Sequence, residues 1–203
     1  MHNYQILEKG KPLHQAAKAI VLLHGRGASA KDIIGLADAF CDDSFYIAAP
    51  QATNHTWYPY SFLAPESQNE PWLSSAVATV KRLIDEISVR IPAENIYIMG
   101  FSQGACLSLE VATRFAQQYA GVAAFTGGLI GEVLKPEKYS GNFNGTPVFI
   151  GNSDRDPHVP AERSEASARL MESMGSLVTH VVYPAMPHTI TTEEIKTVQR
   201  LMF

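Results

Sequence analysis

Residues 96–112, IYIMGFSQGACLSLEVA, hold the pattern that decides how this chain folds. An apolar run, Ile96–Met99, is followed at once by the five residues Gly100–Gly104, and a mostly apolar run continues from Ala105 to Tyr119. This order predicts a strand, a sharp turn and a buried central helix. The turn has the form G-x-S-x-G, in which the small residues on either side of Ser102 leave room for the bend. A serine hydroxyl exposed at such a turn is placed to act as a nucleophile.

The same alternation of strand and helix continues on both sides of this stretch. Short apolar runs predict strands at Ala19–Leu23, Phe45–Ala49, Ile96–Met99, Gly121–Phe125, Pro147–Ile150 and Leu177–Tyr183, with an edge strand around Tyr4–Leu7. Amphipathic runs predict helices after Ser29, from Pro71, over Ala105–Tyr119, over Pro160–Met174 and from Thr191. The repeated order predicts an α/β fold, a mostly parallel sheet with helices on both faces.

Size and composition exclude several classes of function. The 203 residues suit a single domain, residues 1–203. The net charge of -4 argues against a nucleic-acid partner. No apolar run approaches the 18 residues that would predict a membrane span, and the N-terminus does not resemble a signal peptide. Cys41 and Cys106 are too few to form a disulfide framework, so we expect a cytoplasmic protein.

An acid that orients a catalytic histidine is expected after the strand at 147–150. In an open α/β sheet, site residues follow the carboxyl ends of strands, and the expected order along the chain is serine, acid, histidine. Two aspartates compete for this role. Asp156 precedes a proline, which holds it extended and favours a fixed orienting acid. Asp154 more plausibly caps the turn by accepting backbone N–H groups.

The general base is expected one strand later. His188 follows the strand at 177–183 and lies in a loop at the carboxyl edge of the predicted sheet. His180 lies inside that strand, where packing explains it. His158 follows the predicted acid by two residues and is expected on the loop surface. Ser102, Asp156 and His188 are therefore the predicted catalytic residues.

Two backbone N–H groups are expected to stabilise the oxyanion that forms when a serine attacks a carbonyl. One should come from Gln103, directly after the nucleophile, and the other from the loop after the first buried strand. That loop is His24–Gly27, and Arg26 is the candidate donor. The pair Gly25 and Gly27 could also indicate a phosphate cradle, but the third glycine and the Lys-Ser/Thr of phosphate loops are missing.

With these pieces placed, the chain resembles the phospholipase/carboxylesterase family, which includes the acyl-protein thioesterases. The matching stretches are VLLHGRGAS (21–29), IYIMGFSQGACLSLEVA (96–112), DRDPHVP (154–160) and MPHTI (186–190). The resemblance implies an α/β-hydrolase fold with little or no cap, acting on small carboxyl esters or thioesters. It implies Ser102, Asp156 and His188 as the triad, and it supports Arg26 and Gln103 as oxyanion donors.

One position departs from the family pattern. The place of Arg26 is often leucine in the family, and a cation there would either favour anionic substrates or turn to solvent. Substrate contacts are predicted from the aromatic segment 51–72, with Trp57, Tyr58 and Trp72 as candidates, although such side chains also pack loops onto a protein body. No metal site and no cofactor are predicted, because the histidines do not fall at metal-ligand spacings.

The expected function is a serine carboxylesterase that hydrolyses small esters or acyl-thioesters through an acyl-enzyme. The alternatives are a lysophospholipase, a peptidase, a dienelactone-type hydrolase, which typically carries cysteine at the nucleophile position, or a non-catalytic ligand-binding module on the same fold. The expected partner is a small-molecule substrate.

Overall fold

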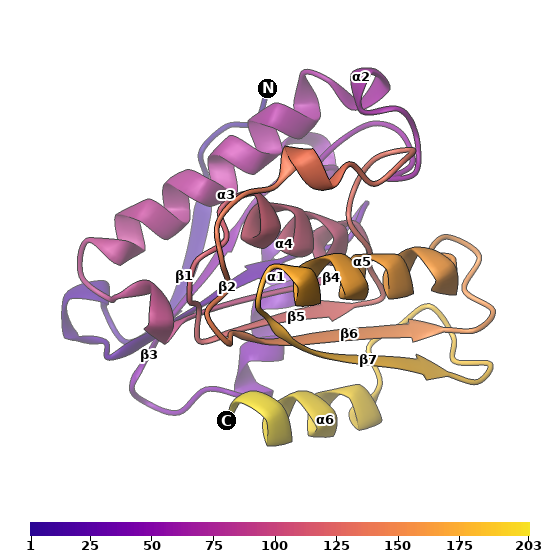
Figure 1. The fold of residues 1–203 in the computed structure, drawn as a ribbon. Helices are drawn as coiled ribbons and strands as arrows, with labels where there is room; N and C mark the ends of the chain where they lie inside the picture. The colour runs from indigo at the N-terminus through magenta and orange to yellow at the C-terminus, as the bar shows by residue number, and fades with distance from the viewer.

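A computed structural model describes residues 1–203 and contains one seven-stranded sheet with the order β1-β3-β2-β4-β5-β6-β7 (Figure 1). Only β1 runs antiparallel, against β3. The strands are β1 Ile6–Gly10, β2 Lys18–Leu23, β3 Phe45–Pro50, β4 Ile96–Phe101, β5 Gly121–Phe125, β6 Pro147–Ser153 and β7 Leu177–Tyr183. The α-helices are α1 Ala30–Ile33, α2 Glu66–Asn69, α3 Trp72–Ser88, α4 Gln103–Arg114, α5 Ala161–Ser173 and α6 Thr192–Met202.

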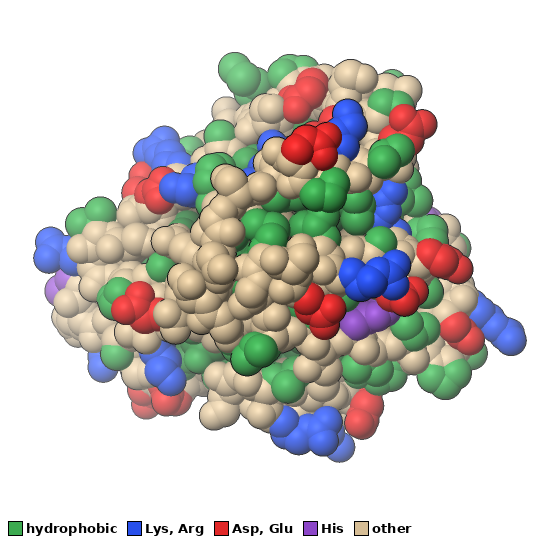
Figure 2. Space-filling view, in the orientation of Figure 1, with side chains coloured by type: hydrophobic (Ala, Val, Ile, Leu, Met, Phe, Trp, Pro, Cys, Tyr) green, Lys and Arg blue, Asp and Glu red, His purple; other side chains and the backbone are tan.

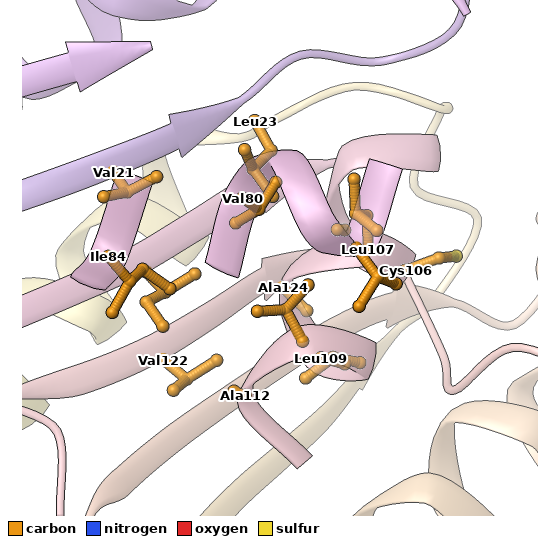
Figure 3. Packing of buried hydrophobic residues seen from close by; sticks show 14 of the residues in the cluster. Val21, Leu23, Val80, Ile84, Cys106, Leu107, Leu109, Ala112, Val122 and Ala124 are labelled. Atoms are coloured by element: carbon orange, nitrogen blue, oxygen red, sulfur yellow. The ribbon is translucent and has the colours of Figure 1, made fainter. Parts of the chain in front are cut away.

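Helices cover both faces of the sheet, because parallel strands buried on two sides present apolar side chains to each. The larger core cluster joins one face to α3, α4 and α5; Figure 3 shows part of it, with Val80 and Ile84 of α3 lying near Val21 and Leu23 of β2. The smaller cluster joins the other face to α1, α6 and the 3-10 helix Ile34–Ala39. The result is the three-layered α/β-hydrolase fold, without a separate cap.

Three elements differ from their sequence-based bounds by three or more residues at one end. The central helix α4 ends at Arg114, five residues before Tyr119, because the chain beyond it bonds to a different segment: Tyr119 N–H donates to Thr146 Oγ1. Strand β6 continues past Ile150 to Ser153 because its partner β7 runs alongside as far as Tyr183. The edge strand β1 is shifted to Ile6–Gly10.

The order of strands explains how distant parts of the sequence meet. From β2 the chain moves to β3 on one side, and β4 then pairs with β2 on its other side, with Leu23 beside Gly100. The loops that follow β2 and β4 therefore leave the sheet side by side at its carboxyl edge. Such a switch point is where open α/β sheets bind ligands.

The surface carries charges of both signs. On the face in Figure 2, acidic and basic side chains are interspersed rather than gathered into a patch of one sign. No helix combines the length and the apolar composition that crossing a bilayer requires.

Candidate active site

Ser102 sits at a strained turn between β4 and α4. Its backbone has φ 54° and ψ -117°, in a region that side chains rarely adopt. The flanking glycines make the turn possible: a Cβ at Gly100 would lie 2.3 Å from the carbonyl oxygen of Gly104, and one at Gly104 would lie 2.1 Å from that of Leu23. The Ser102 N–H donates to the carbonyl of Phe125 on β5, which anchors the turn to the sheet.

The structure brings Ser102, His188 and Asp156 into one hydrogen-bonded chain. The distance from Ser102 Oγ to His188 Nε2 is 2.9 Å, and that from His188 Nδ1 to Asp156 Oδ2 is 2.6 Å. The three residues follow β4, β7 and β6 respectively, at the same edge of the sheet. A serine hydroxyl that donates to an imidazole, itself oriented by a carboxylate, is the arrangement that activates a serine nucleophile.

Asp156 is held as an ionised acceptor. Its Oδ1 accepts the N–H groups of His158 and Val159 at 2.8 and 2.9 Å, which leaves Oδ2 for the imidazole. Burial raises the pKa of Asp156, but the hydrogen bonds from His188 and the two N–H groups outweigh it, so the pKa lies below its ordinary value. The competing Asp154 accepts the N–H of Ala185 at 2.7 Å and so braces the loop that carries His188.

The loop after β2 leaves a backbone donor free beside the serine. His24 is fully buried, donates from Nδ1 to the carbonyl of Gly25 at 2.8 Å and accepts the N–H of Ala52 at Nε2. The Arg26 N–H donates to no group of the protein. Gln103 is the first residue of α4, so its N–H has no acceptor one turn earlier in the helix. Both predicted oxyanion donors are thus available beside Ser102.

A cavity of about 620 Å³ opens over Ser102 and His188. The segments Tyr58–Leu63 and Pro157–Pro160 line this cavity together with Arg26, Gln103 and Cys106. The reactive groups therefore face a cavity lined by two different loops, which we call its two walls.

Comparison with known proteins places the chain in a family. The sequence profile of the phospholipase/carboxylesterase family matches residues 2–202. The chain belongs to the phospholipase/carboxylesterase family. Membership makes it a hydrolase of the serine esterase type.

Individual relatives agree with this placement. The crystal structure of a phospholipase/carboxylesterase from Dyadobacter fermentans is 51% identical, with a TM-score of 0.97 over 99% of this chain and 97% of that one. A rice protein (Oryza sativa subsp. japonica) named as a probable carboxylesterase is 27% identical over 87% of this chain and 73% of its own length. Acyl-protein thioesterase 1 of Gibberella zeae is 30% identical over 58% of this chain, and the match spans about half of the fungal protein, 51%.

Two of the three aromatic residues predicted to contact substrate do not reach the cavity of this family member. Tyr58 lines the cavity. Trp57 is fully buried, and its Nε1–H donates to the carbonyl of His24, so it packs the loop onto the body instead. Trp72 begins α3 and lies edge-on to the ring of His2, with centroids 5.3 Å apart. The assignment of Trp57 and Trp72 to substrate contact is therefore corrected.

Arg26 is an exposed residue, but its side chain does not extend freely into solvent, and a preference for anionic substrates stays a prediction. Its guanidinium donates to Thr56 Oγ1 and to the carbonyls of Pro59 and Tyr60, at 3.0, 2.9 and 2.7 Å. The side chain is thus bonded to the aromatic loop.

Two residues that the sequence did not single out also hold this loop. Asn69, fully buried, accepts the N–H of Tyr60 and donates to the carbonyl of Ser61. His2 lies beside Trp57, 2.8 Å from its carbonyl, and accepts the N–H of Thr53 at Nδ1. No sequence pattern predicts that Asn69 and His2 hold this loop. Both residues bond backbone groups of the loop, which lies near them only in the folded chain.

Proposed function

We propose that this protein is a carboxylesterase or acyl-thioesterase that works through an acyl-enzyme on Ser102. The observation that carries the proposal is the hydrogen-bonded chain Ser102–His188–Asp156 beside a cavity. The alignment of this chain with proteins named as carboxylesterase and acyl-protein thioesterase supports the same reaction class.

In the proposed reaction, His188 Nε2 takes the proton of Ser102 as Oγ attacks the substrate carbonyl carbon. The C=O bond becomes a C–O⁻ bond in a tetrahedral intermediate. His188 then gives the proton to the departing alkoxide or thiolate, and the acyl group remains on Ser102. A water molecule, deprotonated by His188, then attacks the acyl-enzyme and forms a second tetrahedral intermediate. When this intermediate collapses, His188 returns the proton to Ser102 Oγ and the carboxylic acid is released.

The N–H groups of Arg26 and Gln103 would stabilise the oxyanion in both tetrahedral intermediates. Each such donor supplies about 3 kcal/mol of transition-state stabilisation in enzymes of this kind. Asp156, kept ionised by its backbone donors, would stabilise the imidazolium cation and fix the tautomer of His188.

The experiment that tests this function combines turnover with labelling. Wild-type protein should hydrolyse p-nitrophenyl butyrate and react with one equivalent of a fluorophosphonate at Ser102. The variant Ser102→Ala should lose both while keeping its unfolding transition. Turnover by Ser102→Ala at the wild-type rate would exclude the proposed nucleophile, and wild-type protein that neither turns over esters nor takes the label would be a binding module.

Substrate class is tested by a panel of esters, acyl-thioesters, lysophospholipids, lactones and peptides assayed side by side. We expect the highest kcat/KM for simple esters or acyl-thioesters.

The cytoplasmic location stays a prediction from the cysteine content; Cys41 and Cys106 are both free thiols.

A further inference from the structure

The loop Thr56–Tyr60 is tied to the two residues that offer the oxyanion donors. Gln103 accepts the N–H of Trp57 at Oε1 and donates from Nε2 to the carbonyl of Tyr58, at 2.9 and 2.8 Å. Arg26 donates to the loop at Thr56, Pro59 and Tyr60. The side chains of both oxyanion residues therefore hold the same loop, while their backbone N–H groups stay free for substrate.

Arg26 makes three hydrogen bonds to this loop from an exposed position. Its guanidinium is planar and presents several donors in fixed directions, so it can bond three acceptors of one loop at once. It also lies over the ring of Tyr58, 6.0 Å from the centroid. A leucine at this position would keep the backbone N–H and lose every one of these contacts.

The wall that this loop forms faces one particular part of a substrate. His188 must reach the leaving oxygen or sulfur to protonate it, so the leaving group is assigned to the His188 side. The segment Pro157–Pro160 lies on that side, because the rings of His158 and His188 have centroids 5.1 Å apart. The oxyanion points to the N–H groups of Arg26 and Gln103. On this assignment the acyl chain takes the remaining direction, along the other lining segment, Tyr58–Leu63.

We propose that the Arg26 side chain is a positioning residue that sets acyl-group selectivity by fixing the loop Thr56–Tyr60 as the acyl wall of the cavity. The inference rests on the proposed function, because it assigns the two walls from the direction of acyl transfer. Arg26 acts through the loop and binds no part of the substrate with its guanidinium. A wall held in one place binds a longer acyl chain without first having to be ordered, so the benefit grows with acyl length.

The test uses two series of esters with wild-type protein, Arg26→Leu and Arg26→Lys. One series varies the acyl group from acetate to hexanoate with p-nitrophenol as the constant leaving group. The other keeps the acetyl group and varies the alcohol. In Arg26→Leu we expect kcat/KM for hexanoate relative to acetate to fall about tenfold, mainly through KM. The selectivity among alcohols should keep its wild-type order and spread.

Matched variants separate positioning from general loss of structure. Arg26→Lys should recover part of the acyl selectivity, because an ammonium group can still reach a loop carbonyl. Arg90→Leu removes the same charge from an exposed position at the end of α3 and should retain wild-type selectivity. Thr56→Val removes one acceptor of Arg26 and the hydroxyl's 3.2 Å hydrogen bond to Gln103 Oε1, keeps both backbone oxyanion donors, and should change the acyl series in the same direction. It keeps the test available where Arg26→Leu fails to fold.

Three results would overturn the inference. An unchanged or increased ratio for hexanoate would show that Arg26 does not order the acyl wall. Equal losses in both series would place its effect on the oxyanion hole. A loss confined to an acyl group with a terminal carboxylate, such as a succinate monoester, would make the guanidinium a substrate contact. If wild-type protein hydrolyses no ester in either series, it is the proposed function that fails.

Discussion

Ser102 has a backbone conformation that the surrounding structure must stabilise. A positive φ on a residue with a side chain costs about 1–3 kcal/mol, so the surrounding structure must hold it in place. Here it is held by the Phe125 carbonyl and by the absence of side chains at Gly100 and Gly104. These glycines are visible in the sequence, and the turn was predictable for that reason.

Thr126 is a second strained residue at the carboxyl edge of the sheet, and no sequence pattern predicts its conformation. It directly follows β5, has φ 62° and is fully buried. A β-branched residue is among the least suited to this conformation. Its N–H donates to the Gly151 carbonyl on β6, which draws the backbone into place.

Gly104→Ala should destabilise the protein and remove activity. The new Cβ would lie 2.1 Å from the Leu23 carbonyl oxygen, so β2 and α4 would have to separate. We expect a loss of about 2–3 kcal/mol in the free energy of unfolding, measured by urea titration. Gly35→Ala is the control, because a Cβ there meets no atom within 4 Å. Equal stability of the two variants would contradict the steric account of the elbow.

Asp156→Asn should reduce kcat by about 10⁴-fold without unfolding the protein, since an amide favours the wrong tautomer of the base. Asp154→Asn is the matched control two residues away. Its carboxylate bonds the Ala185 N–H, an interaction that an amide oxygen can keep. Steady-state kinetics on one ester measures both. A similar loss in the two variants would mean that either aspartate could be the orienting acid.

At the scale of elements, α4 carries a buried ionic group. Glu110 is fully buried, and its carboxylate contacts Arg114 and Lys138 and accepts the N–H of Ile130 and the hydroxyl of Tyr139. Arg114 and Lys138 also pair with Glu66 of α2. Helix α4 is thereby bonded to α2 and to residues 126–145, the segment between β5 and β6. The sequence shows Glu110 only as one charge in an apolar helix, so its partners were not predictable.

Glu110→Ala should cost about 3 kcal/mol of unfolding free energy, because Arg114 and Lys138 keep only Glu66, and the Ile130 N–H and Tyr139 hydroxyl lose their buried acceptor. Glu165→Ala on α5 is the control, since Glu165 and Arg169 form the same i,i+4 pair on an exposed surface. Such a pair contributes about 0.5 kcal/mol or less. Chemical denaturation of both variants checks the difference. Comparable losses would show that burial of the pair has no energetic consequence.

At the scale of the whole molecule, the positions of residues that follow strands were predictable from the sequence, whereas the contacts of the loops were not. Parallel strands place the residues after β4, β6 and β7 at one edge of the sheet, so Ser102, Asp156 and His188 could be predicted to lie close together. The walls of the cavity depend on which side chains capture loop carbonyls. The role of Trp57 was wrong for that reason, and the partners of Arg26 were not predictable: these side chains bond mainly to backbone atoms of remote segments, which no periodicity indicates.

Stability should fall as pH drops below about 6.5, through His2 and His24. Burial lowers the pKa of both from the ordinary value of 6.5, against the opposing effect of their hydrogen bonds to backbone carbonyls. Below that value the unfolded chain takes up protons that the folded chain does not, so stability is full above it and declines as pH falls towards the folded-state pKa values. The urea midpoint should therefore be lower at pH 5.5 than at pH 7.5.

His2→Gln should weaken this pH dependence, because glutamine can offer similar hydrogen bonds and does not titrate. The readout is the difference in urea midpoint between the two pH values, compared with wild-type protein. His14→Gln is the control at an exposed histidine. An identical pH dependence in wild-type protein and His2→Gln would remove His2 from the account.

The attachment of Thr56–Tyr60 by side chains, rather than by a strand, has a consequence for redesign. The sheet does not depend on this loop for its hydrogen bonds, whereas the loop depends on His2, Arg26, Asn69 and Gln103. A loop grafted from another family member should therefore travel with its own residues at those four positions. Because these four residues bond mainly to backbone atoms of the loop, libraries that vary the loop's side chains should keep it attached, whereas substitutions at the four anchors should release it.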